Sequence, residues 1–107
     1  MIRVTVLYPK TATSRFDKDY YLNKHTPMVK ERLTPTGLLG LGVDEGLGTL
    51  VPGEPPVFEI IGYLEFASVE DLQKSLATHG AEIMADITNY TDIQPIMQVN
   101  RIAQPIS

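Results

Sequence analysis

Residues 16–33 constrain the fold most, because their apolar positions repeat with the spacing of a single helix face. The side chains on that face are Tyr21, Leu22, His25, Met28, Val29 and Leu33. Polar residues such as Lys18, Lys24 and Lys30 lie mostly on the other face. This face buries apolar side chains but also includes an imidazole, with two adjacent tyrosines. These polar groups either have no function beyond packing or serve a functional site.

The position of His25 on this helix allows two interpretations. A lone histidine on a buried face is usually structural and hydrogen-bonded to a carbonyl or hydroxyl group. In the functional reading it faces a pocket, where an imidazole can donate or accept a proton near neutral pH. Pro27 removes a helical hydrogen bond and disfavours helical geometry at the preceding residue, so we expect a kink or local break beside His25.

The rest of the chain alternates between strand and helix patterns. Strands are predicted at residues 2–8, 38–48, 57–66 and 93–102, with a bulge in the glycine-rich second strand. The first helix has Asp17 as its N-cap, and the second begins after Ser68 and is interrupted at His79-Gly80 before it resumes. This β-α-β-β-α-β order predicts an α+β, ferredoxin-like fold, with a four-stranded antiparallel sheet and two helices on one face.

Apolar residues stand on both faces of the predicted strands, and they include Leu7, Ile61, Tyr63, Met97 and Val99. One helix layer cannot account for all of them, and a small sheet does not leave a large apolar face in water. We therefore expect a homodimer whose sheets pack face to face.

Length and composition exclude several classes of protein. The 107 residues are enough for one domain, residues 1–107, and too few for two. A net charge of −4 and the lack of a basic run argue against nucleic acid or an acidic membrane surface as a partner. No apolar run is long enough to cross a bilayer, and residues 1–6 lack a signal-peptide core. The chain has no cysteine, which excludes disulfides and thiolate sites and suits the reducing cytoplasm.

Six short blocks carry a resemblance to a known family, and they are Val6-Leu7-Tyr8-Pro9, Phe16-Asp17, Tyr20-Tyr21-Leu22, His25-x-Pro27, Glu65-Phe66-x-Ser68 and Asp86-Ile87-x-Asn89-Tyr90. In this order they make the chain resemble an EthD-like member of the dimeric α+β-barrel superfamily. The resemblance implies a homodimer with a central barrel and a pocket between each sheet and its helices. It maps His25 to the motif histidine of the family and Tyr20 and Tyr21 to the aromatic pair before it.

The expected site combines this mapping with the helix pattern. The predicted catalytic residues are His25, Tyr20, Tyr21 and Asp86. The predicted ligand-binding residues are Met28, Phe58, Ile60, Ile83 and Tyr90. Asp86 also has a structural reading, as a solvated carboxylate at a helix end. Asn89 and Tyr90 match the later family block together with Asp86.

We expect no metal and no cofactor. His25 and His79 lie on different predicted helices, and neither belongs to a cluster with the ligand spacing of a metal site. His79 precedes a glycine at the predicted helix break, where a cation near a helix C-terminus is the simpler reading.

Three functions remain open at this point. The first is a cofactor-free enzyme that acts on a small apolar carbonyl, enol or lactone compound, with His25 as general acid or base and a tyrosine beside it. The resemblance supports this class, because related members of the superfamily include cofactor-free monooxygenases, lactone isomerases and polyketide cyclases or dehydratases. The second is a non-catalytic dimer that binds a small molecule or serves as an accessory subunit. The third is a haem-binding protein with His25 as the ligand.

Overall fold

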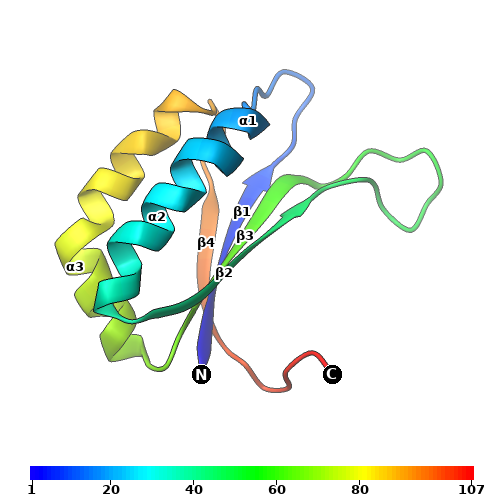
Figure 1. Ribbon diagram of the computed structural model, residues 1–107. Helices are drawn as coiled ribbons and strands as arrows, with labels where there is room; N and C mark the ends of the chain where they lie inside the picture. The colour runs from blue at the N-terminus through cyan, green and yellow to red at the C-terminus, as the bar shows by residue number, and fades with distance from the viewer.

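The computed structural model describes all 107 residues and confirms the α+β, ferredoxin-like fold. Its four strands are β1 (Ile2–Pro9), β2 (Leu38–Glu45), β3 (Phe58–Phe66) and β4 (Ile96–Arg101). They form one antiparallel sheet in the order β2-β3-β1-β4. The helices α1 (Lys18–Tyr20), α2 (Thr26–Leu33) and α3 (Val69–Asp86) cover one face of the sheet (Figure 1). None of them has the length and apolar character that a membrane-spanning helix requires.

The first helical segment changes its winding beside the histidine, where a kink or break was expected. Its N-cap is Asp17, whose carboxylate accepts a hydrogen bond from the N–H of Tyr20. After α1 the chain makes a π-helical turn, η1 (Tyr21–His25), and then continues as α2. The segment therefore stays helical throughout, but its hydrogen-bond register shifts by one residue at η1.

Pro27 explains how this shift is accommodated. In the π register the N–H of Thr26 donates to the carbonyl of Tyr21, so the next donor in line for the carbonyl of Leu22 would be Pro27. Proline has no N–H to give. The hydroxyl of Thr26 donates to the Leu22 carbonyl instead, at 3.3 Å.

The wider turn also decides which side chains are buried. Tyr21, His25, Val29 and Leu33 are buried and stand four residues apart. A regular α-helix would rotate this row steadily away from the sheet, because it has only 3.6 residues per turn. The π turn contains more residues and brings Tyr21 back into line with Val29. Leu22, which the helix pattern placed on the buried face, is exposed.

The second helix runs without the predicted interruption. Ser68 caps it by accepting a hydrogen bond from the N–H of Asp71, and α3 then continues through His79 and Gly80. The prediction of a break at His79-Gly80 is therefore wrong, and His79 is not at a helix end. A glycine inside a helix costs only about 1 kcal/mol relative to alanine. The packing of the buried face of α3, which includes Leu72, outweighs this cost.

Strand pairing shows which residues face the helices. Val4 pairs with Val99 and Val6 pairs with Met97, and paired side chains share a face of the sheet. Since Val4 is buried beneath the helices, Met97 and Val99 also belong to the helix-covered face. The apolar residues on the opposite face are Leu7, Ile61, Tyr63 and Ile96.

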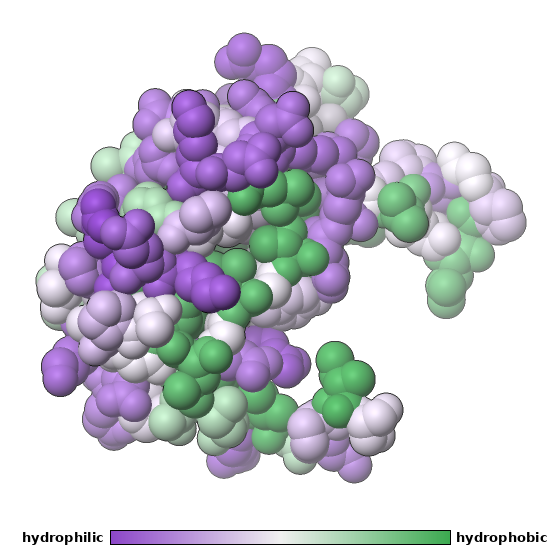
Figure 2. All heavy atoms as spheres, in the orientation of Figure 1, coloured by the Kyte–Doolittle hydropathy of each residue, from purple (hydrophilic) through white to green (hydrophobic).

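The core between helices and sheet consists of two clusters. The first is aliphatic apart from one phenylalanine and contains Ile2, Val4, Val29, Leu33, Leu38, Phe66 and Leu72. The second is rich in tyrosine and contains Tyr8, Tyr21, Ile60, Ile87, Tyr90 and Ile93. Apolar side chains gather between the helices and the strands, while polar residues cover much of the outer surface (Figure 2). Apolar side chains also stand on the loop that projects between β2 and β3, and Leu47 and Leu50 are exposed there (Figure 2).

Candidate functional site

A cavity of about 190 Å³ lies between the two clusters of the core. Its lining is mostly aliphatic and contains no Lys, Arg, Asp or Glu side chain. Tyr8, Tyr21 and His25 bring polar groups to it. The cavity therefore combines a hydrophobic volume with hydroxyl and imidazole groups, as small-molecule sites do.

His25 is held by a carboxylate behind the cavity. Its Nδ1 lies 2.8 Å from Oδ2 of Asp86, which stands at the last residue of α3. The other carboxylate oxygen accepts hydrogen bonds from the Tyr20 hydroxyl at 2.7 Å and from the Asn89 amide at 2.9 Å. Burial raises the pKa of Asp86, but the hydrogen bonds from Asn89, His25 and Tyr20 outweigh burial, so its pKa lies below the ordinary value.

This arrangement determines the state of the imidazole. An ionised carboxylate can only accept hydrogen bonds, so Nδ1 of His25 carries the hydrogen that the pair shares. In the neutral ring Nε2 is then the acceptor nitrogen. The hydroxyl of Tyr90 lies 3.4 Å from Nε2, and it lies 2.6 Å from the hydroxyl of Tyr8. The site therefore holds a continuous row of hydrogen-bonding groups from Asp86 through His25 to two tyrosines.

Tyr21 provides the hydroxyl that is free to meet a ligand. Its ring stacks on the imidazole of His25, with ring centroids 5.5 Å apart and planes inclined by 18°. Its hydroxyl makes no hydrogen bond within the protein, yet no buried polar side-chain atom is left unpartnered, so this hydroxyl is open to the cavity. Burial raises the pKa of Tyr21 far above its ordinary value, which keeps the hydroxyl protonated as a donor.

Gly62 makes room for this hydroxyl. A Cβ atom at position 62 would lie only 2.9 Å from the Tyr21 oxygen. The glycine of β3 therefore lets the tyrosine reach across the cavity to the sheet. Sequence reasoning missed Gly62 and Tyr8, although an isolated glycine inside a strand is a signal for close approach by another group.

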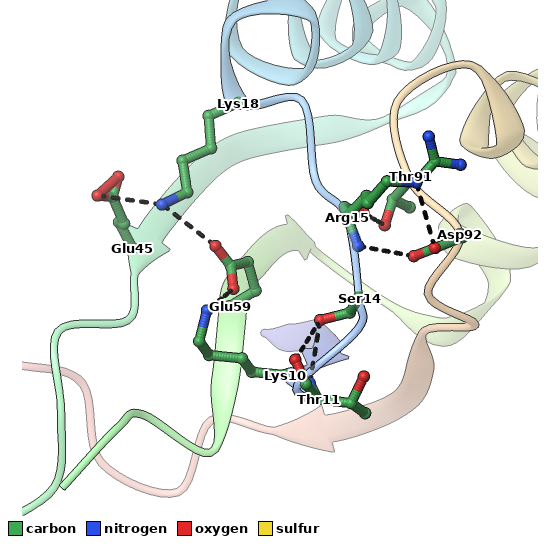
Figure 3. Close-up of polar contacts among 9 residues, drawn as sticks. All are labelled: Lys10, Thr11, Ser14, Arg15, Lys18, Glu45, Glu59, Thr91 and Asp92. Carbon is green, nitrogen blue, oxygen red and sulfur yellow. Dashed lines mark hydrogen bonds and ion pairs between the residues drawn. The ribbon is translucent and has the colours of Figure 1, made fainter.

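The loop before α1 fixes the position of the whole site. Phe16 forms a β-bridge with Thr91, and the N–H of Asp17 donates to the carbonyl of Tyr90 at 2.7 Å. Next to it, Arg15 pairs with Asp92 through both its backbone N–H and its guanidinium group (Figure 3). These contacts join the start of the first helix to the segment after α3, so they bring His25 and Asp86 together.

Ion pairs hold the same helix start against the sheet. Lys18 lies between the carboxylates of Glu45 on β2 and Glu59 on β3, at 3.5 and 3.2 Å (Figure 3). Lys10 also pairs with Glu59, at 2.9 Å. Hydrogen bonding from Lys10 is the largest influence on Glu59 and lowers its pKa.

The predicted catalytic residues lie together but have different positions. His25 and Tyr21 line the cavity, whereas Tyr20 and Asp86 lie behind the imidazole. The structural reading of Asp86 as a solvated carboxylate does not describe its position, because three neighbouring side chains bond to it.

The predicted ligand-binding residues are more dispersed. Ile83 lines the cavity, and Tyr90 lies next to His25. Met28, Phe58 and Ile60 are not part of the lining. Met28 packs against the aliphatic cluster and borders a surface depression beside Tyr20. Phe58 pairs with Pro9 and Ile60 with Tyr8, at the end of β1 and the start of β3.

No group of three or more His, Cys, Asp or Glu side chains is arranged to hold a metal ion.

The fold itself is widely shared, so a family assignment needs sequence identity as well as a similar shape. No family model and no curated protein matches the chain.

Solved structures give a clear match. An EthD-like protein from Ralstonia eutropha is 40% identical, with a TM-score of 0.93, and the alignment covers 99% of this chain and 95% of that chain. An EthD family protein from Bacillus halodurans is 20% identical, with a TM-score of 0.74, over 94% of this chain and 97% of that chain. A dimeric ferredoxin-like protein from an uncultured marine organism shares the fold, with 11% identity and a TM-score of 0.62, over 100% of this chain and 99% of that chain. The identity to the Ralstonia protein over nearly the full length of both chains shows that this protein belongs to the EthD-like family.

Proposed function

We propose that the protein is a cofactor-free enzyme in which His25 transfers a proton on a small apolar carbonyl, enol or lactone compound. The observation that carries this proposal is the pair of His25 and Asp86 at the wall of an apolar cavity. A histidine that served only to fill the core would not need an ionised carboxylate on one nitrogen and a ligand-sized space beside its ring. Carboxylate support of Nδ1 is the arrangement that makes Nε2 a proton acceptor and stabilises the imidazolium ion that follows.

The proton transfer takes place in two steps. Nε2 of His25 removes a proton from the carbon next to a carbonyl group, the C–H electron pair forms a carbon–carbon double bond, and the carbonyl oxygen takes the negative charge. The imidazolium then returns the proton. Where the enolate is conjugated to a second double bond, return of the proton to the far carbon re-forms the carbonyl group and moves the double bond, which is an isomerisation. Where a hydroxyl group stands on the β carbon, the carbonyl group re-forms, the C–O bond breaks to leave a carbon–carbon double bond, and the returned proton leaves with the hydroxyl as water, which is a dehydration. Asp86 remains ionised throughout and holds the ring in place.

Tyr21 stabilises the charge that develops on oxygen. Its hydroxyl is a protonated donor that no group of the protein occupies, and its ring is fixed against that of His25. Tyr20 acts only indirectly, because its hydroxyl donates to the carboxylate of Asp86 and not to the substrate. The two adjacent tyrosines therefore have separate roles, one toward the substrate and one toward the base.

A turnover screen with carbonyl, lactone and anthrone-like compounds tests the proposal, followed by substitution of each histidine. His25→Asn should lower the turnover number by about 10²–10⁴-fold, which is the usual contribution of a general acid or base. His79→Asn is the matched control, because His79 lies on α3 outside the cavity lining. A His25→Asn variant with native turnover would show that the mechanism is wrong.

The same protein preparation separates the two alternatives. Tight ligand binding without turnover of any compound would favour a non-catalytic binding protein. A strong visible absorption band after addition of haem, lost in His25→Asn, would favour haem binding.

We also propose that the protein is a homodimer formed through the open face of the sheet. The support is the apolar residues left on that face, Leu7, Ile61, Tyr63 and Ile96, and the dimeric ferredoxin-like neighbour. The interface should bury more than about 1,200 Å² in total. Light scattering at micromolar concentration should give twice the chain mass of 11.9 kDa. A well-folded monomer would overturn the proposal.

A further inference from the structure

The cavity beside His25 has an open side that is rich in large apolar side chains. Leu76 and Met84 on α3 and Met97 and Val99 on β4 all belong to its lining, and each is between 44% and 50% exposed. The other large apolar residues of the lining are buried or half-buried. These four residues therefore form a rim between α3 and the edge strand β4, where the cavity meets solvent.

Gly80 stands on α3 between two members of this rim, although it is not itself part of the cavity lining. It lies midway between Leu76 and Met84, four residues from each, so the three positions follow one stripe of α3. A Cβ atom at position 80 would point at the side chain of Leu76, 3.6 Å from its Cβ. A side chain added at position 80 would therefore pack against Leu76 of the rim.

The lining determines which kind of molecule can enter. It contains no Lys, Arg, Asp or Glu side chain that could balance a buried charge. A carboxylate, phosphate or ammonium group inside it would lose its hydration without compensation. A neutral oxygen-bearing group can accept a hydrogen bond from the Tyr21 hydroxyl, and a neutral hydroxyl group can also donate one to Nε2 of His25, whose charge is already balanced by Asp86.

We infer that the site binds a neutral amphiphile, with its oxygen-bearing head group at Tyr21 and His25 and its hydrocarbon tail passing out between α3 and β4. The exposed rim of Leu76, Met84, Met97 and Val99 contacts the tail, and Gly80 adds no side chain that would crowd Leu76. This inference rests on the proposed function for the position of the head group only. It predicts that the length of the tail, and not the head group alone, controls affinity.

The test measures binding, so it does not depend on catalysis. The probes are para-alkylphenols from para-cresol to para-hexylphenol, titrated into the full-length protein by calorimetry. Each methylene that the cavity or rim covers should increase affinity by about fourfold. Gly80→Leu places a side chain against Leu76 of the rim and should reduce the affinity for the longest member by roughly 15-fold, which equals the loss of about two methylene contacts, while para-cresol binds nearly as before.

Two further variants make the outcome specific. Ala77→Leu adds the same side chain at an exposed position of α3 outside the cavity lining. It should leave the affinity for every phenol of the series unchanged. Val99→Phe narrows the rim from β4 and should repeat the effect of Gly80→Leu, so the test stands even where one variant fails to fold.

The inference is overturned if the affinity is equal for all members of the series, or if both rim variants bind the series as the native protein does. It is also overturned if the rim variants change the oligomeric state of the protein but not the dependence of affinity on tail length. The proposed function fails separately. If the series behaves as expected but His25→Asn leaves turnover intact, the tail site stands and the proton-transfer mechanism does not.

Discussion

Replacement of Gly62 by alanine tests the position of the Tyr21 hydroxyl, on which both binding and catalysis depend. The new Cβ would lie 2.9 Å from the Tyr21 oxygen, whereas ordinary contacts begin near 3.4 Å, so the hydroxyl must move by about 0.5 Å. The ring has little freedom to move, because Phe16 and Tyr90 each pack against it with centroids 5.1 Å away. We therefore expect strain and not a simple rotation of the side chain.

The expected change in the free energy of unfolding is the difference between two opposing contributions. Overpacking of a tight core site typically costs about 1–3 kcal/mol. Alanine in place of glycine within a strand returns about 0.5–1 kcal/mol by restricting the unfolded chain. Gly62→Ala should therefore reduce the free energy of unfolding by roughly 0.5–2 kcal/mol and should also lower turnover, because the oxyanion donor is displaced.

Urea unfolding and turnover measured on the same variants provide the assay. Gly40→Ala is the matched control, because a Cβ at position 40 on the neighbouring strand β2 meets no atom within 4 Å. This control should be neutral or slightly more stable than the native protein. If Gly62→Ala equals Gly40→Ala in both stability and turnover, the Tyr21 hydroxyl does not lie against β3, and the reasoning about the site is refuted.

Two further predictions concern the groups around the imidazole. Since the pKa of Asp86 is lowered in the folded protein, its carboxylate stabilises the fold above the ordinary value of 3.8, and this contribution is lost as pH falls through the lower folded-state pKa. The stability advantage of the native protein over Asp86→Asn, measured by urea unfolding, should therefore shrink at acid pH, and a constant difference would contradict the assignment. Tyr21→Phe should lower the turnover number by about 10²–10³-fold. Tyr20→Phe should have a smaller effect and should raise the pKa of Asp86, measured by NMR; equal rate losses in the two variants would show that the tyrosines do not have separate roles.

Much of the fold could be predicted because it depends on local patterns. Alternation in the strands, the Asp17 and Ser68 caps and the strand order in sequence all act over a few residues, and the structure confirms them. The break at His79-Gly80 was predicted wrongly for a related reason. The cost of a helical glycine is local, but the packing that outweighs it comes from the sheet beneath the helix.

The site could be predicted only in part, because its contacts join distant parts of the chain. The pattern identified His25 and both tyrosines, but the bond from His25 to Asp86 spans 61 positions and the contact with Tyr90 spans 65. The shifted winding at η1 also changes which residues of the first helix face the cavity, and Leu22 lies exposed. No periodicity with a constant helical repeat can show such a shift.

The proline after the histidine connects these two observations. Pro27 cannot donate to the helix, so the π turn before it costs fewer hydrogen bonds than it would in an uninterrupted helix, and the Thr26 hydroxyl replaces the missing donor. That turn aligns Tyr21 with His25 and sets the two rings in a stack. The bridge between Phe16 and Thr91 then brings Asp86 and Tyr90 to the same imidazole from the other end of the chain. The local winding thus sets which ring faces the cavity, and the long-range bridge supplies the carboxylate that makes Nε2 the acceptor nitrogen of this ring.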